Sequence, residues 1–271
     1  MVNNIAHRGA RSLAPENTLL SAEKAKQIGA HLWETDIQLT ADGVPVLLHD
    51  RSLARTTDVE QVFPEGEPWF VDQFSLDEIL RLDTGRRFIQ DDPFDQIKAG
   101  ALSPGELIEM TCVPIPTLLQ ALDVTSQLDW KVILELKRHP KLDNSGALTQ
   151  AVLESISESN ITHDQVVISS FDHDIIRTIQ AERPELEIQA LVHFLDLDAD
   201  AEPEFSTYNV WSRVNSAEDV ARAVSIGVEI NVYTVNDVDQ MRRYIDAGAS
   251  GLFTDFPQRL AQIQETGSGI M

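Results

Sequence analysis

Short runs of β-type residues alternate with longer segments of helical periodicity along most of this 271-residue chain. Such alternation predicts βα units, in which consecutive strands lie parallel and helices cover the sheet. Several runs are almost continuously apolar, among them Val132-Ile133-Leu134 and Val166-Val167-Ile168, which is typical of strands covered on both faces. The pattern therefore favours an α/β fold built on a mostly parallel sheet.

Nine runs in the sequence are candidate strands. They are Asn4–His7, Leu32–Leu39, Val44–His49, Val132–Lys137, Val166–Ser170, Ile188–His193, Tyr208–Trp211, Glu229–Val235 and Gly251–Thr254. Nine is one more than an eight-stranded barrel needs, and the run from Tyr208 to Trp211 has the weakest strand pattern of the set.

Segments of helical periodicity fall between these runs. In the first of them, Asn17 is the expected N-cap and Gly29 the expected end. The connections between elements are short except for residues 51–114, a stretch too long for an unstructured loop in a compact fold. We expect this stretch to be a small inserted subdomain with a helix over Leu76–Leu82, within a chain that forms a single domain over residues 1–271.

The balance of charge excludes several classes of ligand. The chain has 21 Lys and Arg against 44 Asp and Glu, which gives a formal net charge of −23. Nucleic acids and anionic lipid surfaces bind to clustered positive charge, so we expect neither nucleic-acid binding nor stable membrane association. A small-molecule ligand remains, and an anionic one would need a local positive site.

Features of location and of other sites are few. The N-terminal Met1-Val2-Asn3-Asn4 lacks a basic region and an apolar signal core, and no run approaches the ~18 apolar residues of a membrane span. The single Cys112 cannot form an internal disulfide. The acidic stretch Asp196–Glu202 lacks the glycine and the closing glutamate of an EF-hand, so we expect a solvated loop. These features favour a cytoplasmic protein.

Polar clusters lie in or at the ends of four predicted strands, the ends being where barrel and open α/β enzymes place their active sites. They are His7-Arg8-Gly9, Glu34-Thr35-Asp36, His49-Asp50 and Glu135-Leu136-Lys137. Because side chains alternate along a strand, Glu34 and Asp36 share one face, as do Glu135 and Lys137. Three carboxylates at one barrel mouth would repel one another without a cation, and oxygen ligands without cysteine suit Mg²⁺ or Ca²⁺.

Each of these residues alone would also fit an ordinary structural role. A single acid is usually exposed or ion-paired, and His7 alone would fit a buried core histidine. Four charged residues paired on two apolar strands fit that interpretation poorly, because burying charge is costly without a partner or a metal. The remaining histidines, which include His193, lack such neighbours, and we expect structural or surface roles for them. The sequence contains no G-x-S-x-G, G-x-x-x-x-G-K-[ST], G-x-G-x-x-G or H-E-x-x-H motif.

Eleven short motifs, in order along nearly the whole chain, match one known family. They are Ala6-His7-Arg8-Gly9, Pro15-Glu16-Asn17-Thr18, Glu34-Thr35-Asp36, Thr40-Ala41-Asp42-Gly43-Val44-Pro45-Val46, His49-Asp50, Leu53-Ala54-Arg55-Thr56-Thr57, Ile115-Pro116-Thr117-Leu118, Glu135-Leu136-Lys137, Ser169-Ser170-Phe171, Tyr233-Thr234-Val235-Asn236 and Thr254-Asp255-Phe256-Pro257. On these residues the chain resembles the glycerophosphodiester phosphodiesterases. The resemblance implies a (β/α)₈ TIM barrel with an insertion after the third strand, in agreement with the long connection at 51–114.

The resemblance also implies roles for individual residues. The implied acid–base pair is His7 and His49, the implied ligands of one divalent cation, Mg²⁺ or Ca²⁺, are Glu34, Asp36 and Glu135, and the implied substrate-binding residues are Arg8, Lys137, Phe171 and Tyr233. This chain departs from the family at Ile133, where Asn is frequent, and at Tyr233, where Trp is common; both departures bear on the shape of the pocket.

The implied reaction is the metal-dependent hydrolysis of a glycerophosphodiester, such as glycerophosphocholine or glycerophosphoethanolamine, to sn-glycerol 3-phosphate and an alcohol. A cation with Arg8 and Lys137 would neutralise the phosphoryl oxygens. Imidazoles titrate near ~6.5, which suits both proton transfers at neutral pH. We expect His7 to act as the base and His49 as the acid in the first step. Attack by water, and attack by the neighbouring glycerol hydroxyl through a cyclic phosphate, both remain open.

Two other functions are alternatives. One is a lysophospholipase D-like or sphingomyelinase D-like phosphodiesterase, which needs an apolar mouth or a membrane-docking surface. The other is a non-catalytic barrel that binds phosphate esters, which loss of a histidine or of a metal ligand would favour.

Overall fold

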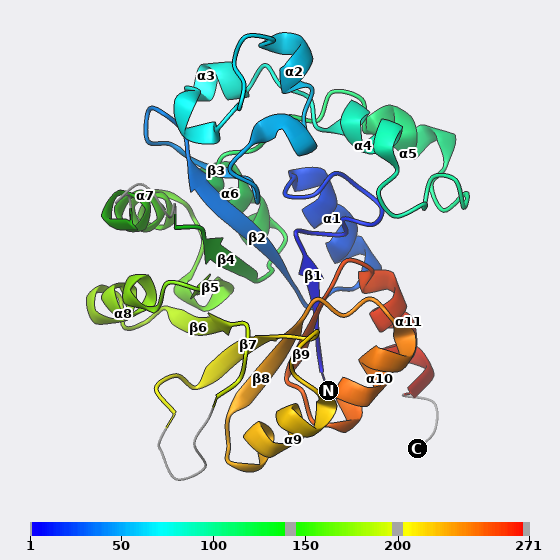
Figure 1. Cartoon of the computed structure of the whole chain (residues 1–271), viewed down its shortest axis with the longest axis vertical. Coiled ribbons are helices and arrows are strands. Elements are labelled where there is room, and N and C mark those ends of the chain that lie inside the picture. The colour runs from blue at the N-terminus through cyan, green and yellow to red at the C-terminus, as the bar shows by residue number, and fades with distance from the viewer. Residues whose placement is uncertain (1, 139–144, 197–202, 268–271) are drawn as a thin grey trace.

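The computed structural model describes residues 2–138, 145–196 and 203–267; most of the acidic stretch singled out in the sequence, residues 197–202, lies outside them. Within these ranges, eight parallel strands close into a barrel, because β1 pairs with both β2 and β9 (Figure 1). The barrel strands are β1 (Asn3–His7), β2 (Leu32–Leu39), β4 (Val132–Leu136), β5 (Val166–Ser170), β6 (Glu187–Val192), β7 (Thr207–Trp211), β8 (Glu229–Tyr233) and β9 (Gly251–Thr254). The predicted TIM barrel is confirmed.

The ninth strand is not the one that the sequence pattern marked as weakest. β7 pairs in parallel with β6 and with β8 and is a full barrel strand. The extra strand is β3 (Pro45–Leu47), which pairs antiparallel with β2 and lies outside the barrel. A turn with Gly43 at a φ of 80° sends the chain back on itself, and Asp-Gly is a frequent hairpin turn. The third strand of the chain is therefore a hairpin arm.

Helices cover the outside of the barrel, as Figure 1 shows. They are α1 (Leu19–Ile28), α6 (Leu118–Gln127), α7 (Ser145–Glu158), α8 (His173–Glu182), α9 (Ala217–Ser225), α10 (Val238–Asp246) and α11 (Pro257–Gly267). The main hydrophobic core lies between these helices and outward-facing strand residues such as Trp33, Leu134 and Ile168. A second, smaller cluster of Ile5, Ile133 and other inward-facing residues fills the barrel interior. No helix among the described residues has the length and apolar character needed to cross a bilayer.

The first helix begins one residue later than predicted. Thr18 is its N-cap and accepts a hydrogen bond from the backbone N–H of Ser21, so the predicted cap at Asn17 is wrong. Gly29 ends the helix as predicted, with a left-handed φ of 91°. Asn17 itself has a φ of 56°, and its side chain is thereby free to point toward the barrel instead of capping the helix.

Residues 51–114 form a group of short helices at the carboxyl end of the β2–β3 hairpin, seen together at the top of Figure 1. They are the 3₁₀ helices η1 (Leu53–Arg55) and η2 (Val71–Gln73) and the α-helices α2 (Val59–Val62), α3 (Leu76–Ile79), α4 (Gly85–Asp91) and α5 (Pro104–Glu109). The helix expected over Leu76–Leu82 is α3, which ends at Ile79. The segment has a small core of its own, which includes Val46 of β3 and Ile115. The hairpin arm therefore anchors this segment to the barrel.

Candidate active site

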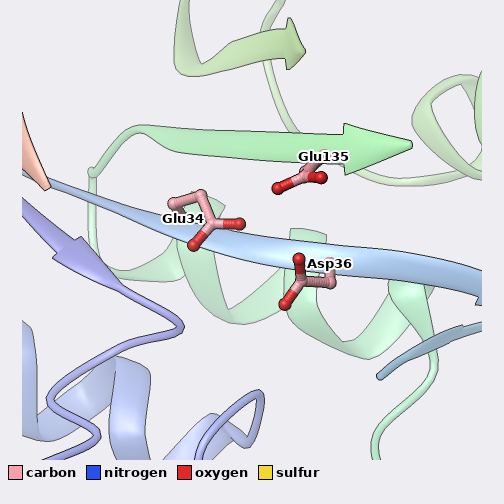
Figure 2. Close-up of side chains that lie close together, drawn as sticks. All are labelled: Glu34, Asp36 and Glu135. Atoms are coloured by element: carbon pink, nitrogen blue, oxygen red, sulfur yellow. The ribbon is translucent and has the colours of Figure 1, made fainter. Parts of the chain in front are cut away.

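Three carboxylates meet at the carboxyl end of the barrel strands. Glu34 and Asp36 come from β2 and Glu135 from β4, and in the sheet register Asp36 lies beside Glu135. One carboxylate oxygen of each lies within 4.8 Å of the other two, and all three side chains are buried. Figure 2 shows the three carboxyl groups pointing toward one another. The alternation along the strands therefore brings together the three predicted ligands.

Two cations compensate part of this negative charge. Lys137 Nζ lies 3.0 Å from Asp36 Oδ1 and forms a second ion pair with Glu135, while Arg8 Nε lies 3.1 Å from Asp36 Oδ2. Burial would raise the pKa of Asp36, but Lys137 and Arg8 hold it well below its usual range. Asp36 is therefore ionised and tightly held.

Glu34 is less well compensated than Asp36. Its Oε2 accepts the backbone N–H of Arg8 at 3.0 Å, whereas its Oε1 is buried without a hydrogen-bond partner among the described residues. Burial and the neighbouring Asp36 and Glu135 raise the pKa of Glu34 well above its usual value. Burial also raises the pKa of Glu135. A buried, unpartnered carboxylate oxygen beside two further carboxylates fits a hard divalent cation such as Mg²⁺ or Ca²⁺.

Asn17 holds Asp36 in place, a role that the sequence pattern did not predict. Its Nδ2 donates to Asp36 Oδ2 at 2.9 Å. Its Oδ1 accepts hydrogen bonds from Thr35 Oγ1 at 2.8 Å and from the backbone N–H of Asp36 at 3.2 Å. Both functional ends of the amide are thus bonded to β2. The left-handed backbone at Asn17, a conformation that Asn tolerates, makes this reach possible.

His7 ends β1 and bonds to a carboxylate that follows β9. Its Nδ1 lies 2.7 Å from Asp255 Oδ1, and Asp255 is further held by Asn236 Nδ2 at 2.7 Å. Burial lowers the pKa of His7 to about 4; Arg8 acts in the same direction and Asp255 against it. Burial would raise the pKa of Asp255, but His7, Arg11 and Asn236 lower it to about 2. His7 is thus neutral at pH 7, with its proton on Nδ1 and a free lone pair on Nε2.

His49, just beyond β3, has a matching partner. Its Nδ1 lies 2.6 Å from Asp50 Oδ1, and Asp50 is ion-paired to Arg55. Burial would raise the pKa of Asp50, but the hydrogen bonds from His49 and Arg55 lower it to about 2. The side chain of His49 is 32% exposed, more than that of His7. Both imidazoles therefore keep Nε2 free of their carboxylate partners.

A single cavity of about 290 Å³ receives most of these side chains. Of the predicted site residues, His7, Arg8, Glu34, His49, Glu135, Lys137, Phe171 and Tyr233 line it. Asp36 is fully buried and joins the site through the carboxylate cluster. The structure therefore brings all nine predicted site residues together at one end of the barrel.

Aromatic rings form part of the wall of the cavity. The ring of Phe171 stacks on His193 with centroids 4.6 Å apart and meets Tyr233 edge-on at 6.2 Å. His193 in turn meets Trp211 edge-on at 5.7 Å. The hydroxyl of Tyr233 donates to the backbone carbonyl of Val192 at 3.0 Å, which fixes that ring. His193 and Trp211 also line the cavity, although the sequence pattern indicates a structural or surface role for His193 and marks no role for Trp211.

Comparison with known proteins gives consistent matches over the whole barrel. The model of the glycerophosphoryl diester phosphodiesterase family matches residues 7–259. A glycerophosphodiester phosphodiesterase of Caldanaerobacter subterraneus subsp. tengcongensis is 31% identical over 270 residues, which cover 97% of this chain and 98% of that protein. A second, from Bacillus altitudinis, is 28% identical over 275 residues, 98% of this chain and 99% of that protein.

A solved structure has the same fold. An Oleispira antarctica phosphodiesterase in complex with the product sn-glycerol-3-phosphate superposes with a TM-score of 0.77 at 26% identity, over 96% of both chains.

Proposed function

The chain belongs to the glycerophosphoryl diester phosphodiesterase family of enzymes, and from that premise we propose that it hydrolyses glycerophosphodiesters to sn-glycerol 3-phosphate and an alcohol. Glycerophosphocholine and glycerophosphoethanolamine are the proposed substrates. The observation that carries the proposal is one cavity holding two carboxylate-bonded histidines beside Arg8, Lys137 and the carboxylate cluster. The product bound to the Oleispira antarctica phosphodiesterase supports the substrate class.

The substrate phosphate is the first group that the site must accommodate. Its negative charge resists attack by a nucleophile, so the phosphoryl oxygens must be neutralised. The buried Arg8 and the half-buried Lys137 line the cavity and provide positive charge at that point. The carboxylates of Glu34, Asp36 and Glu135 would hold one Mg²⁺ or Ca²⁺, which would add Lewis-acid stabilisation of the same oxygens.

The two histidines divide the proton transfers between them. His7, neutral at pH 7, accepts through Nε2 the proton of the attacking hydroxyl, and Asp255 stabilises the imidazolium that results. His49 donates a proton to the oxygen of the leaving alcohol, with Asp50 holding its ring. Acid–base catalysis of this kind contributes about 10²- to 10⁴-fold.

Two attacking groups fit this arrangement. Water attacks in direct hydrolysis, whereas the neighbouring glycerol hydroxyl attacks in a route through a cyclic phosphate. In the second route, water opens the cyclic ester and the two histidines exchange roles. The aromatic wall of Phe171, His193, Trp211 and Tyr233 lies beside the polar cluster and would contact the apolar surface of the substrate.

The test is a product assay on the purified chain. With glycerophosphocholine or glycerophosphoethanolamine as substrate, we expect sn-glycerol 3-phosphate and the free amino alcohol in equal amounts. A chelator should abolish the release, and added Mg²⁺ or Ca²⁺ should restore it. Lysophosphatidylcholine and sphingomyelin are the comparison substrates, and preference for either would support the lysophospholipase D-like or sphingomyelinase D-like alternative. No sn-glycerol 3-phosphate with either metal would contradict the proposal.

A further inference from the structure

Glu16 contacts three arginines around the site although it does not line the substrate cavity. Its Oε1 accepts hydrogen bonds from Arg8 Nη1 at 3.0 Å and from Arg55 Nη2 at 2.7 Å. Its Oε2 accepts from Arg11 Nη2 at 2.5 Å and from Arg55 Nη1 at 3.0 Å. The carboxylate is 9% exposed and lies in the loop between β1 and α1. One buried carboxylate thus satisfies four guanidinium N–H groups.

Arg11 connects Glu16 to the carboxylate partner of His7. Arg11 Nη1 lies 3.4 Å from Asp255 Oδ1, the same oxygen that bonds to His7 Nδ1. The guanidinium of Arg11 therefore bridges Glu16 and the partner of His7. A shift of this guanidinium would move the carboxylate that holds the imidazole.

Arg55 connects Glu16 to the carboxylate partner of His49. Arg55 belongs to η1 at the start of the 51–114 segment, and it forms a fork-to-fork pair with Glu16 through its two terminal nitrogens. Its Nε is bonded to Asp50, whose other oxygen bonds to His49 Nδ1. Glu16 is therefore connected to His49 through Arg55 and Asp50, just as it is connected to His7 through Arg11 and Asp255.

The third arginine is part of the site itself. Arg8 Nη1 bonds to Glu16 while its Nε faces Asp36, so the two carboxylates hold the guanidinium from two sides. Burial would raise the pKa of Glu16, but Arg11, Arg55 and Arg8 keep it well below its usual range. Glu16 is therefore ionised at neutral pH, and its three arginines connect it to Asp255, Asp50 and Asp36.

We propose that Glu16 is a positioning residue that sets both histidines and Arg8 relative to one another, an inference that rests on the proposed function of the site. Planar forks of arginine and carboxylate fix orientation as well as distance, so they transmit the position of one group to the next. Because His7 comes from the barrel and His49 from the end of the β3 arm, a shared anchor keeps the two imidazoles in register across the cavity.

The direct test observes the two imidazoles by NMR in the 271-residue chain labelled with ¹⁵N-histidine. Signals are assigned with His7→Gln and His49→Gln, and the wild type is compared with Glu16→Gln. We expect Glu16→Gln to displace the ring-nitrogen signals of both His7 and His49. The matched control is Asp72→Asn, which removes a carboxylate from a two-pronged pair with Arg51 in the 51–114 segment and should leave both signals in place.

Kinetics supply a second measurement. For Glu16→Gln we expect kcat on glycerophosphocholine to fall by about 10- to 100-fold, since small misplacement of reacting groups has effects of that size. KM should change less than kcat, and Glu16→Asp, which retains the charge with a shorter reach, should recover part of the loss. Circular dichroism verifies that each variant is folded. If Glu16→Gln fails to fold, the NMR comparison is made with Glu16→Asp, whose His7 and His49 signals should both be displaced.

The NMR result decides the inference independently of catalysis. A folded variant in which only one imidazole signal moves, or neither, overturns it. Joint displacement of both signals in a chain without phosphodiesterase activity would support the positioning role of Glu16 and contradict the proposed function alone.

Discussion

His7 and His49 each bond through Nδ1 to a carboxylate, at 2.7 Å from Asp255 and 2.6 Å from Asp50. At the scale of single residues, this shared geometry sets what each ring can do, because a neutral ring with its proton on Nδ1 offers Nε2 as an acceptor. His7 is the more buried ring and has Arg8 beside it, so the structure favours its neutral form. The proposed role as base depends on that form.

The low pKa of His7 predicts a specific dependence of stability on pH. The pKa is about 4 in the folded chain and ~6.5 in the unfolded chain, so between these values only the unfolded chain binds the proton. The free energy of unfolding should therefore fall as the pH falls through this window, by about 3 kcal/mol for this group.

Urea unfolding of the wild type and of His7→Gln between pH 7.5 and pH 4 measures this contribution. Chelator is present throughout so that metal occupancy does not change with pH. Glutamine keeps a donor for Asp255 but does not titrate, so the wild type should lose more stability over the window than the variant. Equal pH slopes for the two proteins would show that His7 titrates normally in the folded chain.

At the scale of elements, local pattern explains why part of the site could be predicted. The alternation of side chains along β2 and β4 is a property of neighbouring residues, and it placed Glu34, Asp36 and Glu135 on the barrel's inner face correctly. The direction of β3 was not accessible in the same way, because a short apolar run fits parallel and antiparallel pairing alike. The local signal for antiparallel pairing was the Asp42-Gly43 turn before β3.

Long-range partners were beyond the reach of sequence pattern. Asp255 lies 248 positions from His7 along the chain, and periodicity contains no information on such pairs. Asn17 was assigned to a helix cap because Asn is common there, although the structure uses its side chain to hold Asp36. The family motifs did include Glu16, Asn17 and Asp255, but only the structure shows what they contact.

The loop from β1 to α1 carries Arg8 and Glu16, and its shape depends on Gly9. Gly9 has a φ of 78°, and a Cβ at this position would lie 2.3 Å from Ser21 Oγ and 2.6 Å from the Ser21 backbone carbon. Gly9→Ala should therefore cost more than the ~1–2 kcal/mol of a left-handed backbone alone, and should also lower activity by displacing Arg8.

Gly29→Ala is the matched control for this prediction. Gly29 also has a left-handed backbone, with a φ of 91°, but nothing lies within 4 Å of a Cβ built there. This variant should lose only about 1–2 kcal/mol and keep its activity. Chemical unfolding and the phosphodiesterase assay compare the two, and equal losses in both properties would show that the loop tolerates a side chain at Gly9.

At the scale of the whole molecule, the net charge of −23 contrasts with an anionic substrate. Arg8 and Lys137 lie against the carboxylate cluster and compensate part of its charge, and a bound divalent cation would add the positive charge that the proposed phosphate needs. The cluster itself brings three buried carboxylates together, with one oxygen of each within 4.8 Å of the others. A divalent cation there should therefore stabilise the entire fold, since a ligand that binds only the folded state shifts the unfolding equilibrium.

Thermal unfolding tests this stabilisation without reference to catalysis. Mg²⁺ or Ca²⁺ at about 100 times its dissociation constant should stabilise the wild type by about 2.7 kcal/mol and raise its Tm. Glu34→Gln removes the carboxylate whose Oε1 is buried without a partner, so its Tm should respond weakly to either metal. Asp72→Asn serves as the control variant and should respond like the wild type. A wild-type Tm that is insensitive to both metals would contradict metal binding at the cluster.

The proposed hydrolysis of glycerophosphodiesters requires both histidines beside the carboxylate cluster, and a comparison of turnover rates examines this requirement. The release of sn-glycerol 3-phosphate from glycerophosphocholine is measured for the wild type and for His49→Ala with the same added metal. We expect steady release by the wild type and a loss of at least about 100-fold in kcat for folded His49→Ala. Near-normal turnover by His49→Ala would contradict the role of His49 as the acid.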